Sequence, residues 1–238
     1  MTSESEVVLL AGGRGSRMAE LTENTQKCLL PLEGRPALGY VLENLVAAYG
    51  SVDLKVAVSY RVDDVMQFVN RNKSEKISVT YVPHSLGGDS WGAYSSMEQI
   101  THGPFVGIPG DVIVLPQVYQ SVLDMYLGAE TVDMVMTLSP KLDEVDTHAL
   151  VKERGGYVSN IEWPAKSVPE ADTHRDVTIY ASDDKFFGYL SKYPRYGNAV
   201  VKSFADALEA EDIKIGAYVT ELPWIHFGYP EDLNKKSL

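Results

Sequence analysis

The chain has 238 residues, of which 45% are hydrophobic and 23% are charged. That length suits one large or two small domains, and the composition excludes a disordered chain, a collagen-like chain and a coiled coil. The single cysteine, Cys28, excludes a disulfide framework and a zinc cluster built on thiolates. The formal net charge of −12 at pH 7 argues against nucleic acid as a partner, because DNA-binding proteins usually carry a basic stripe.

The sequence shows no targeting segment. Its first residues lack the basic and apolar parts of a secretory signal, and no stretch approaches the roughly 20 apolar residues that span a bilayer. We therefore expect a cytoplasmic protein without membrane contact, which could form a homo-oligomer.

Strand-like and helix-like patterns alternate as far as Leu138. They predict strands at 7–11, 54–58, 77–82, 105–109 and 132–138, and helices at 38–48, 62–69, 90–100 and 118–126. Such alternation predicts an α/β fold of three layers, Rossmann-like, with a mixed, mostly parallel sheet and helices on both faces.

The pattern changes after Leu138. Strands are predicted at 149–152, 156–161 and 177–181, as a small β-rich excursion, and at 213–219. Helices are predicted at 184–190 and 200–208, with a last short one beginning at Pro230. Because no low-complexity linker divides the chain, we expect one domain, 1–238, whose first half binds one ligand and whose second half closes over another.

A glycine-rich loop follows the first predicted strand directly. Residues 9–18 read Leu-Leu-Ala-Gly-Gly-Arg-Gly-Ser-Arg-Met. Glycines let a ligand approach the backbone closely, so several N–H groups can point at one anion, and Arg17 adds a fork of donors suited to phosphate. The same sequence is also compatible with a tight strand-to-helix turn that binds no ligand and carries a surface arginine.

Two common phosphate loops do not fit this stretch. The Gly-Lys-Ser or Gly-Lys-Thr ending of a Walker motif is absent. The dinucleotide fingerprint requires a third glycine, or a small residue, where Met18 stands.

The loop and the residues that follow it resemble the nucleotidyltransferases that make NDP-sugars. The resemblance rests on Gly-Gly-x-Gly-Ser-Arg-Met at 12–18, on the run from Leu21 to Leu32 with Lys27, and on Gly34-Arg35-Pro36. Looser matches are Gly110-Asp111 and the segment 224–233. These enzymes join a sugar 1-phosphate to a nucleoside triphosphate and release pyrophosphate.

The resemblance implies roles for particular residues. Residues 1–115 would bind the nucleotide and 116–238 the acceptor, with Arg17, Lys27 and Asp111 catalytic. Asp111 would hold Mg²⁺, or Mn²⁺, because hard carboxylate oxygens suit such ions. The nucleotide would contact Leu10, Ala11, Gly12, Gly13, Gly15, Ser16, Arg17, Lys27, Gly88 and Asp111. The acceptor would contact Glu162, Lys166 and Trp224.

The sequence departs from the family at two important positions. His226 takes the place of the family's second metal-binding aspartate, so it is a candidate metal ligand or simply a half-buried histidine. Glu162-Trp163-Pro164 stands where the family has Glu-Lys-Pro, so the cation that meets the sugar phosphate is missing unless Lys166 replaces it.

Three alternatives stay open. Residues 86–95, ending in Tyr-Ser, are similar to enzymes that activate phosphocholine or another phosphoalcohol with CTP. The two departures could instead mark a nucleotide-binding homologue that has lost catalysis. Gly88-Asp89-Ser90-Trp91-Gly92 also fits the Gly-x-Ser-x-Gly elbow of serine esterases, but five residues separate it from the preceding strand.

Overall fold

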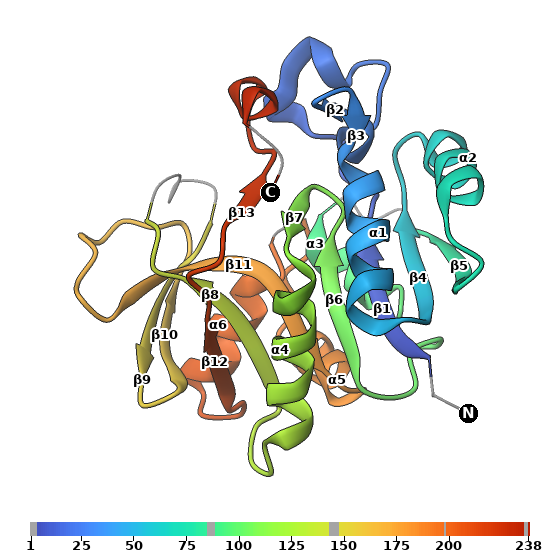
Figure 1. Cartoon of the computed structure of the whole chain (residues 1–238). Coiled ribbons are helices and arrows are strands. Elements are labelled where there is room, and N and C mark those ends of the chain that lie inside the picture. The colour runs from blue at the N-terminus through green and yellow to red at the C-terminus, as the bar shows by residue number, and fades with distance from the viewer. Residues whose placement is uncertain (1–3, 85–88, 143–147, 198, 236–237) are drawn as a thin grey trace.

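A nine-stranded sheet forms the centre of the part of the chain that the structure describes (Figure 1). The structure is a computed structural model and describes residues 4–84, 89–142, 148–197, 199–235 and 238. The strand order is β5-β4-β1-β6-β11-β8-β12-β10-β9, and β11 also pairs with β9. The strands are β1 (Ser5–Leu10), β4 (Val52–Val58), β5 (Ile77–Pro83), β6 (Phe105–Pro109), β8 (Met134–Ser139), β9 (Leu150–Arg154), β10 (Tyr157–Glu162), β11 (Thr173–Ser182) and β12 (Ile215–Val219).

The strand directions confirm the predicted mixed, mostly parallel sheet. β5, β4, β1 and β6 are parallel neighbours, and so are β8 and β12. β11 lies between these two groups and is antiparallel to both β6 and β8. The carboxyl ends of the parallel strands therefore meet at one edge, where ligands bind in open α/β sheets.

Helices cover both faces of the sheet. α1 (Ala37–Tyr49), α2 (Val62–Asn72) and α4 (Pro116–Gly128) pack into one apolar cluster. α3 (Ser90–Ser95), α5 (Lys185–Lys192) and α6 (Val201–Glu209) contribute to the cluster on the opposite face. The protein thus has the three layers that the sequence predicts.

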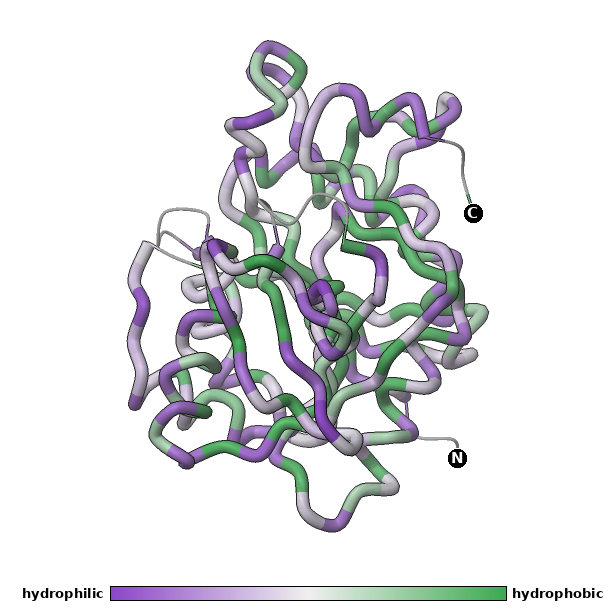
Figure 2. The backbone as a smooth tube through the Cα atoms, turned by 90° about the vertical axis from the view of Figure 1, so that its left-hand side faces the viewer, coloured by the Kyte–Doolittle hydropathy of each residue, from purple (hydrophilic) through white to green (hydrophobic). Residues whose placement is uncertain are grey.

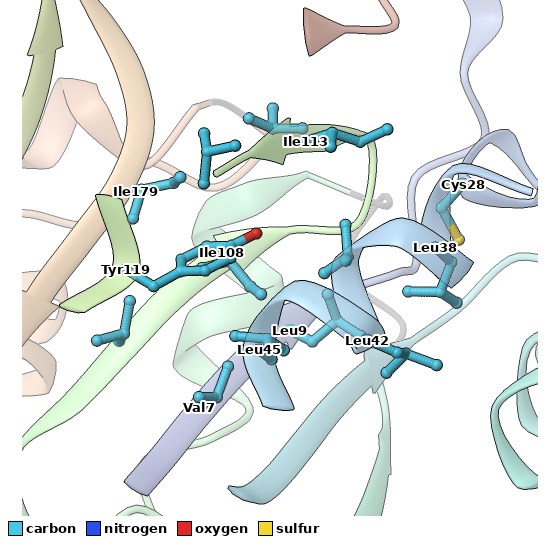
Figure 3. Packing of buried hydrophobic residues seen from close by; sticks show 14 of the residues in the cluster. Val7, Leu9, Cys28, Leu38, Leu42, Leu45, Ile108, Ile113, Tyr119 and Ile179 are labelled. Atoms are coloured by element: carbon cyan, nitrogen blue, oxygen red, sulfur yellow. The ribbon is translucent and has the colours of Figure 1, made fainter. Parts of the chain in front are cut away.

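The helical spacing of leucines explains why α1 lies on β1. Leu38, Leu42 and Leu45 recur along one side of α1 and are almost fully buried over Val7 and Leu9 (Figure 3). In Figure 2 hydrophobic stretches run through the middle of the molecule, and hydrophilic residues are frequent in the outer loops. This core holds β1 and β6 rigidly, and the glycine loop and Asp111 follow these two strands.

Short elements complete the fold. They are β2 (Pro31–Leu32), β3 (Arg35–Pro36), β7 (Val112–Val114), β13 (Trp224–His226) and the 3₁₀ helices η1 (Ser16–Thr22), η2 (Lys27–Leu29) and η3 (Pro230–Asn234). The sequence does not predict the short strands, because two or three residues carry no periodicity and their pairing is tertiary. The prediction of a helix to residue 100 was wrong beyond Ser95, since the chain continues there as turns. Among the described residues, no helix combines the length and the apolar character needed to cross a membrane.

Candidate active site

The glycine loop leaves the carboxyl end of β1 and fits its surroundings closely. A Cβ atom on Gly12 would lie 2.4 Å from Nε2 of His84, which follows β5, so this position has no room for a side chain. Gly15 has a φ of 66°, in the left-handed region that glycine adopts at low cost. Two glycines are thus required by packing and backbone conformation, as expected of a loop shaped for a ligand.

Gln26 fastens the loop to the segment that carries Lys27. Its buried amide nitrogen donates hydrogen bonds to the carbonyl oxygens of Ala11 and Gly13, at 2.8 and 3.0 Å. Its side-chain oxygen accepts a hydrogen bond from the backbone N–H of Cys28, at 2.5 Å. With both ends of its side chain bonded, Gln26 fixes the distance between the loop and Lys27.

Lys27 and Asp111 meet beside this loop. Lys27 Nζ lies 2.5 Å from Asp111 Oδ2, and both side chains are largely buried. Burial alone would raise the pKa of Asp111, but the Lys27 ammonium outweighs it and holds that pKa well below its usual range. Asp111 is therefore an ionised carboxylate at the carboxyl end of β6.

A short ribbon brings His226 to Asp111 from far along the sequence. β13 pairs antiparallel with β7, with His226 opposite Val112, and Phe227 N–H donates to the carbonyl oxygen of Asp111 at 3.1 Å. Figure 1 shows β13 beside β7 at the top of the sheet. His226 Nε2 consequently lies 3.7 Å from Asp111 Oδ2. The structure thus brings together the two residues that the sequence proposes as metal ligands.

The donor set around Asp111 fits a divalent ion. Two donors each about 2.1 Å from one ion lie about 3 to 4 Å apart, which matches the separation of Asp111 Oδ2 and His226 Nε2. Over the described ranges no group of three or more His, Cys, Asp or Glu side chains is arranged to hold a metal. An ion here would complete its coordination with phosphate oxygens and water, as Mg²⁺ commonly does.

A second histidine lies behind His226. His148 Nε2 is 3.0 Å from His226 Nδ1, and His148 Nδ1 is 2.9 Å from the carbonyl oxygen of Asp176. The His148 ring also meets the ring of Trp224 edge to face at 5.4 Å, and the Arg175 guanidinium stacks over that indole at 4.1 Å. His226 is therefore held from behind by a packed polar and aromatic layer.

These groups border a cavity of about 310 Å³ that extends from the glycine loop across the carboxyl ends of the strands. On the loop side its wall includes Gly12, Gly13, Arg17 and Lys27. On the far side the wall includes Trp163, Asp176, Thr178 and Tyr180. A smaller hollow of about 260 Å³ adjoins it, and Gly13, Arg14, Gly15, Ser16, Arg17, Lys27, Asp111 and Gly228 line it. The arrangement can hold two ligands end to end, with Asp111 near their junction.

The far wall of the cavity contains strained backbone and a buried acid. Pairing of β11 with β8 shifts register between Asp176 and Tyr180, and Thr178 within this interval has a φ of 66°. The Thr178 N–H donates to Asp176 Oδ1 and the Tyr180 hydroxyl donates to Asp176 Oδ2, both at 2.7 Å. Burial raises the pKa of Asp176 to about 6 despite these hydrogen bonds. A non-glycine residue in this conformation, at a cavity wall, is typical of a functional position.

The predicted site residues fall into three groups. Leu10, Gly12, Gly13, Arg17, Lys27, Asp111 and His226 line the larger cavity, and Gly15 and Ser16 line the smaller one. Ala11, Glu162, Lys166 and Trp224 lie outside both linings, although Trp163, next to Glu162, is in the wall. Gly88 lies outside the described residues.

Ser90 begins α3, with Asp89 as its N-cap. Its Oγ accepts a hydrogen bond from the backbone N–H of Val200 at 2.8 Å. Within the described part of the chain, no hydrogen bond joins Ser90 to a histidine. The nucleophile–base pair that a serine esterase needs is not assembled here.

Several residues that line the larger cavity were not predicted from the sequence. Gln26 stands directly before Lys27, so its place in that motif could have indicated its role. His84, His148 and Asp176 carried no such signal, because only the fold brings the ends of their strands to one cavity.

Comparisons with known proteins agree with this geometry. Residues 7–148 match the MobA-like NTP transferase domain. Glucose-1-phosphate thymidylyltransferase of Streptomyces griseus is 27% identical over 137 residues, which are 57% of this chain and 38% of that protein. The chain spans between 38% and 63% of the lengths of the first curated relatives it matches.

Solved structures show the same fold at low identity. A UDP-glucose pyrophosphorylase complexed with UDP-glucose superposes with a TM-score of 0.82 at 17% identity, covering 97% of this chain and 96% of that one. The inositol-1-phosphate CTP transferase from T. maritima gives 0.81 at 15% identity, covering 98% and 92%. The Rossmann-like prediction is therefore confirmed, and with the family model matching more than half of its length, the chain belongs to the MobA-like NTP transferase domain family.

Proposed function

We propose that this protein transfers a nucleotidyl group from a nucleoside triphosphate to a sugar 1-phosphate and releases pyrophosphate. The observation that carries the proposal is the glycine loop with Arg17 and Lys27 beside Asp111, at the mouth of a cavity with room for a second ligand. Its relatives of that reaction type, such as the Streptomyces griseus thymidylyltransferase, support it.

The reaction requires little covalent chemistry from the protein. An anionic oxygen of the acceptor phosphate attacks the α-phosphorus, and the bond from that phosphorus to the bridging oxygen breaks. Pyrophosphate leaves with the bonding electron pair, so no proton transfer is needed. Catalysis then consists of aligning two anions and neutralising the charge on their oxygens.

The loop residues supply these two effects. Gly13, Gly15 and Ser16 line the smaller hollow, and their backbone N–H groups would donate to the triphosphate, with Arg17 and Lys27 as its cations. These local charges are needed because the net charge of −12 otherwise repels such substrates. Asp111 and His226 would hold Mg²⁺ or Mn²⁺, which would neutralise charge on the phosphate oxygens.

A second candidate, a CTP-dependent transferase for a phosphoalcohol such as phosphocholine, rests on the far wall. That wall has Trp163 where the resemblance leads one to expect a lysine, and a buried carboxylate, Asp176. An aromatic face together with a carboxylate suits a quaternary ammonium group better than a sugar phosphate. The likeness in fold to the inositol-1-phosphate CTP transferase from T. maritima is consistent with an alcohol phosphate as acceptor.

One screen tests both candidates. Pyrophosphate release is measured for each common nucleoside triphosphate against sugar 1-phosphates and phosphoalcohols, with Mg²⁺ and with Mn²⁺. Turnover with a sugar 1-phosphate supports the first candidate, and turnover with CTP and phosphocholine alone replaces it by the second. Nucleotide binding without pyrophosphate release from any pair would identify a homologue that has lost catalysis and would refute both.

A further inference from the structure

Nothing in the sequence gives His148 a role, yet its ring connects a backbone carbonyl to His226. The carbonyl oxygen of Asp176 can only accept a hydrogen bond, so His148 Nδ1, 2.9 Å away, must carry the hydrogen. A neutral imidazole with its hydrogen on Nδ1 has a lone pair on Nε2, so Nε2 of His148 can accept a hydrogen bond.

The hydrogen of His226 follows from that lone pair. His226 Nδ1 lies 3.0 Å from His148 Nε2, so His226 must donate its Nδ1–H there. A histidine that binds an ion through Nε2 carries its one hydrogen on Nδ1, which is the hydrogen that this contact requires. Its Nε2 is then unprotonated and faces the ionised Asp111 Oδ2 at 3.7 Å.

Two acceptors that face each other require a cation between or beside them. In the structure the Lys27 ammonium lies beside Asp111. A divalent ion could instead use both Asp111 Oδ2 and His226 Nε2, because neither atom has a hydrogen. The alternative tautomer would place an N–H between them and remove His226 from the donor set.

We propose that His148 is a positioning residue, which holds His226 in the tautomer with a free Nε2 and so makes the second donor of the metal site a nitrogen. This inference rests on the proposed function only for the assignment of Asp111 and His226 to the ion. Histidine ligands commonly depend on such a partner behind the ring, and its loss typically weakens metal binding about 10- to 100-fold. An imidazole nitrogen is also a softer donor than a carboxylate oxygen, which favours Mn²⁺ over Mg²⁺.

The first measurement needs neither metal nor substrate. Ring ¹⁵N chemical shifts of the metal-free protein distinguish protonated from unprotonated nitrogens, and His148→Gln and His226→Asp assign the signals. We expect both rings to carry their hydrogen on Nδ1. A hydrogen on Nε2 of His226 would overturn the inference.

The second measurement uses Mn²⁺ as the probe in the full chain. Electron paramagnetic resonance gives the affinity, and electron spin echo modulation detects ¹⁴N bound to the ion. We expect ¹⁴N coupling in the wild type and none in His226→Asp, which replaces the nitrogen by a carboxylate. If His226→Asp retains the coupling, the nitrogen belongs to another residue and the inference fails.

Two variants of His148 isolate its contribution. His148→Gln keeps one donor and one acceptor at about the spacing of the ring nitrogens, whereas His148→Phe keeps a ring but has neither. We expect Mn²⁺ affinity and coupling to persist in the glutamine variant and affinity to fall about 10- to 100-fold in the phenylalanine variant. Equal affinity and coupling in both variants would refute a positioning role.

Should His148→Phe fail to fold, the tautomer in the wild type and the coupling in His148→Gln still decide the matter. Pyrophosphate release is assayed separately on the same samples. A protein with ¹⁴N coupling but no turnover keeps this inference and loses the proposed function. Turnover without ¹⁴N coupling supports the proposed function and refutes this inference.

Discussion

The Lys27 ammonium and the Asp111 carboxylate form an ion pair of 2.5 Å, although each is proposed to serve a different part of the bound substrate. Lys27 would contact the triphosphate, and Asp111 would hold the divalent ion. Without ligands the two charges satisfy each other in a largely buried place, where an unpaired charge is costly. Binding of nucleotide with its ion would thus exchange one ion pair for two new contacts.

This exchange predicts that Lys27→Met changes the affinity for the metal ion and the affinity for the nucleotide in opposite directions. Removing the ammonium frees Asp111, so the affinity of the nucleotide-free protein for Mn²⁺ should rise about tenfold, which corresponds to about 1.4 kcal/mol. The affinity for the triphosphate should fall, because one of its cations is lost. Calorimetric titration of Mn²⁺ and of a nucleotide measures the two separately, and a parallel loss of both would contradict the exchange.

Arg17→Ala should slow turnover about 100- to 1,000-fold with the fold intact, because a donor aimed at developing charge is lost. In the structure its guanidinium lies 5.5 Å from the centre of the Tyr229 ring and borders both hollows. Pyrophosphate release and thermal melting are measured together. Arg71→Ala, at an exposed site in α2, serves as the charge-matched control with unchanged turnover.

Thr178→Gly should leave the protein more stable than Thr178→Ala does. A φ of 66° strains any residue with a Cβ, and relieving such strain returns about 1 kcal/mol or more. Thr178→Ala keeps the strain and removes only the hydroxyl and methyl groups, so it should not gain stability. Urea unfolding measures both variants. Because Thr178 lines the cavity, the glycine variant should also have a changed KM for the acceptor, and equal stability of the two variants would show that the position is unstrained.

Asp176 predicts a specific pH dependence of stability. Burial raises its pKa from 3.8 to about 6, against the hydrogen bonds from Tyr180 and Thr178 and the charge of Arg175. Between these two values the folded protein holds a proton that the unfolded chain has released, so the free energy of unfolding falls as the pH rises. Above pH 6 both states are ionised and this contribution is constant.

Asp176→Asn removes the titration. The free energy of unfolding of the variant minus that of the wild type should be about 2 to 3 kcal/mol higher at pH 7 than at pH 3, because a shift of one pKa unit corresponds to 1.36 kcal/mol. Urea unfolding of both proteins from pH 3 to pH 7 tests it. Parallel stability profiles would show that Asp176 does not titrate in this window.

The sheet and the loop were predictable because their signals are local. Val7, Val8 and Leu9 belong to a short apolar run, which indicates a buried strand, and Leu38, Leu42 and Leu45 recur at helical spacing. The glycines and Lys27 follow in an order that indicates phosphate chemistry. Those predictions needed only neighbours in sequence.

The far wall was not predictable in the same way. His148 and Asp176 are brought together by β9 and β11, whose pairing depends on the completed sheet. The helix predicted to residue 100 stops at Ser95. The prediction was too long because buried apolar residues in the following turns, such as Met97, have the same spacing as another turn of helix. The burial of these residues and the groups around them depend on the tertiary structure and not on neighbours in sequence.

The ribbon of β7 and β13 joins the two metal-binding candidates through only three residue pairs. So short a pairing can open locally without unfolding the central sheet, and each opening would carry His226 away from Asp111. The fraction of molecules ready to take up an ion is then set by the closing free energy of this ribbon. Hydrogen exchange at the amides of Ile225 and Phe227, which face the partner strand, would therefore report on ion-binding competence long before the enzyme as a whole denatures.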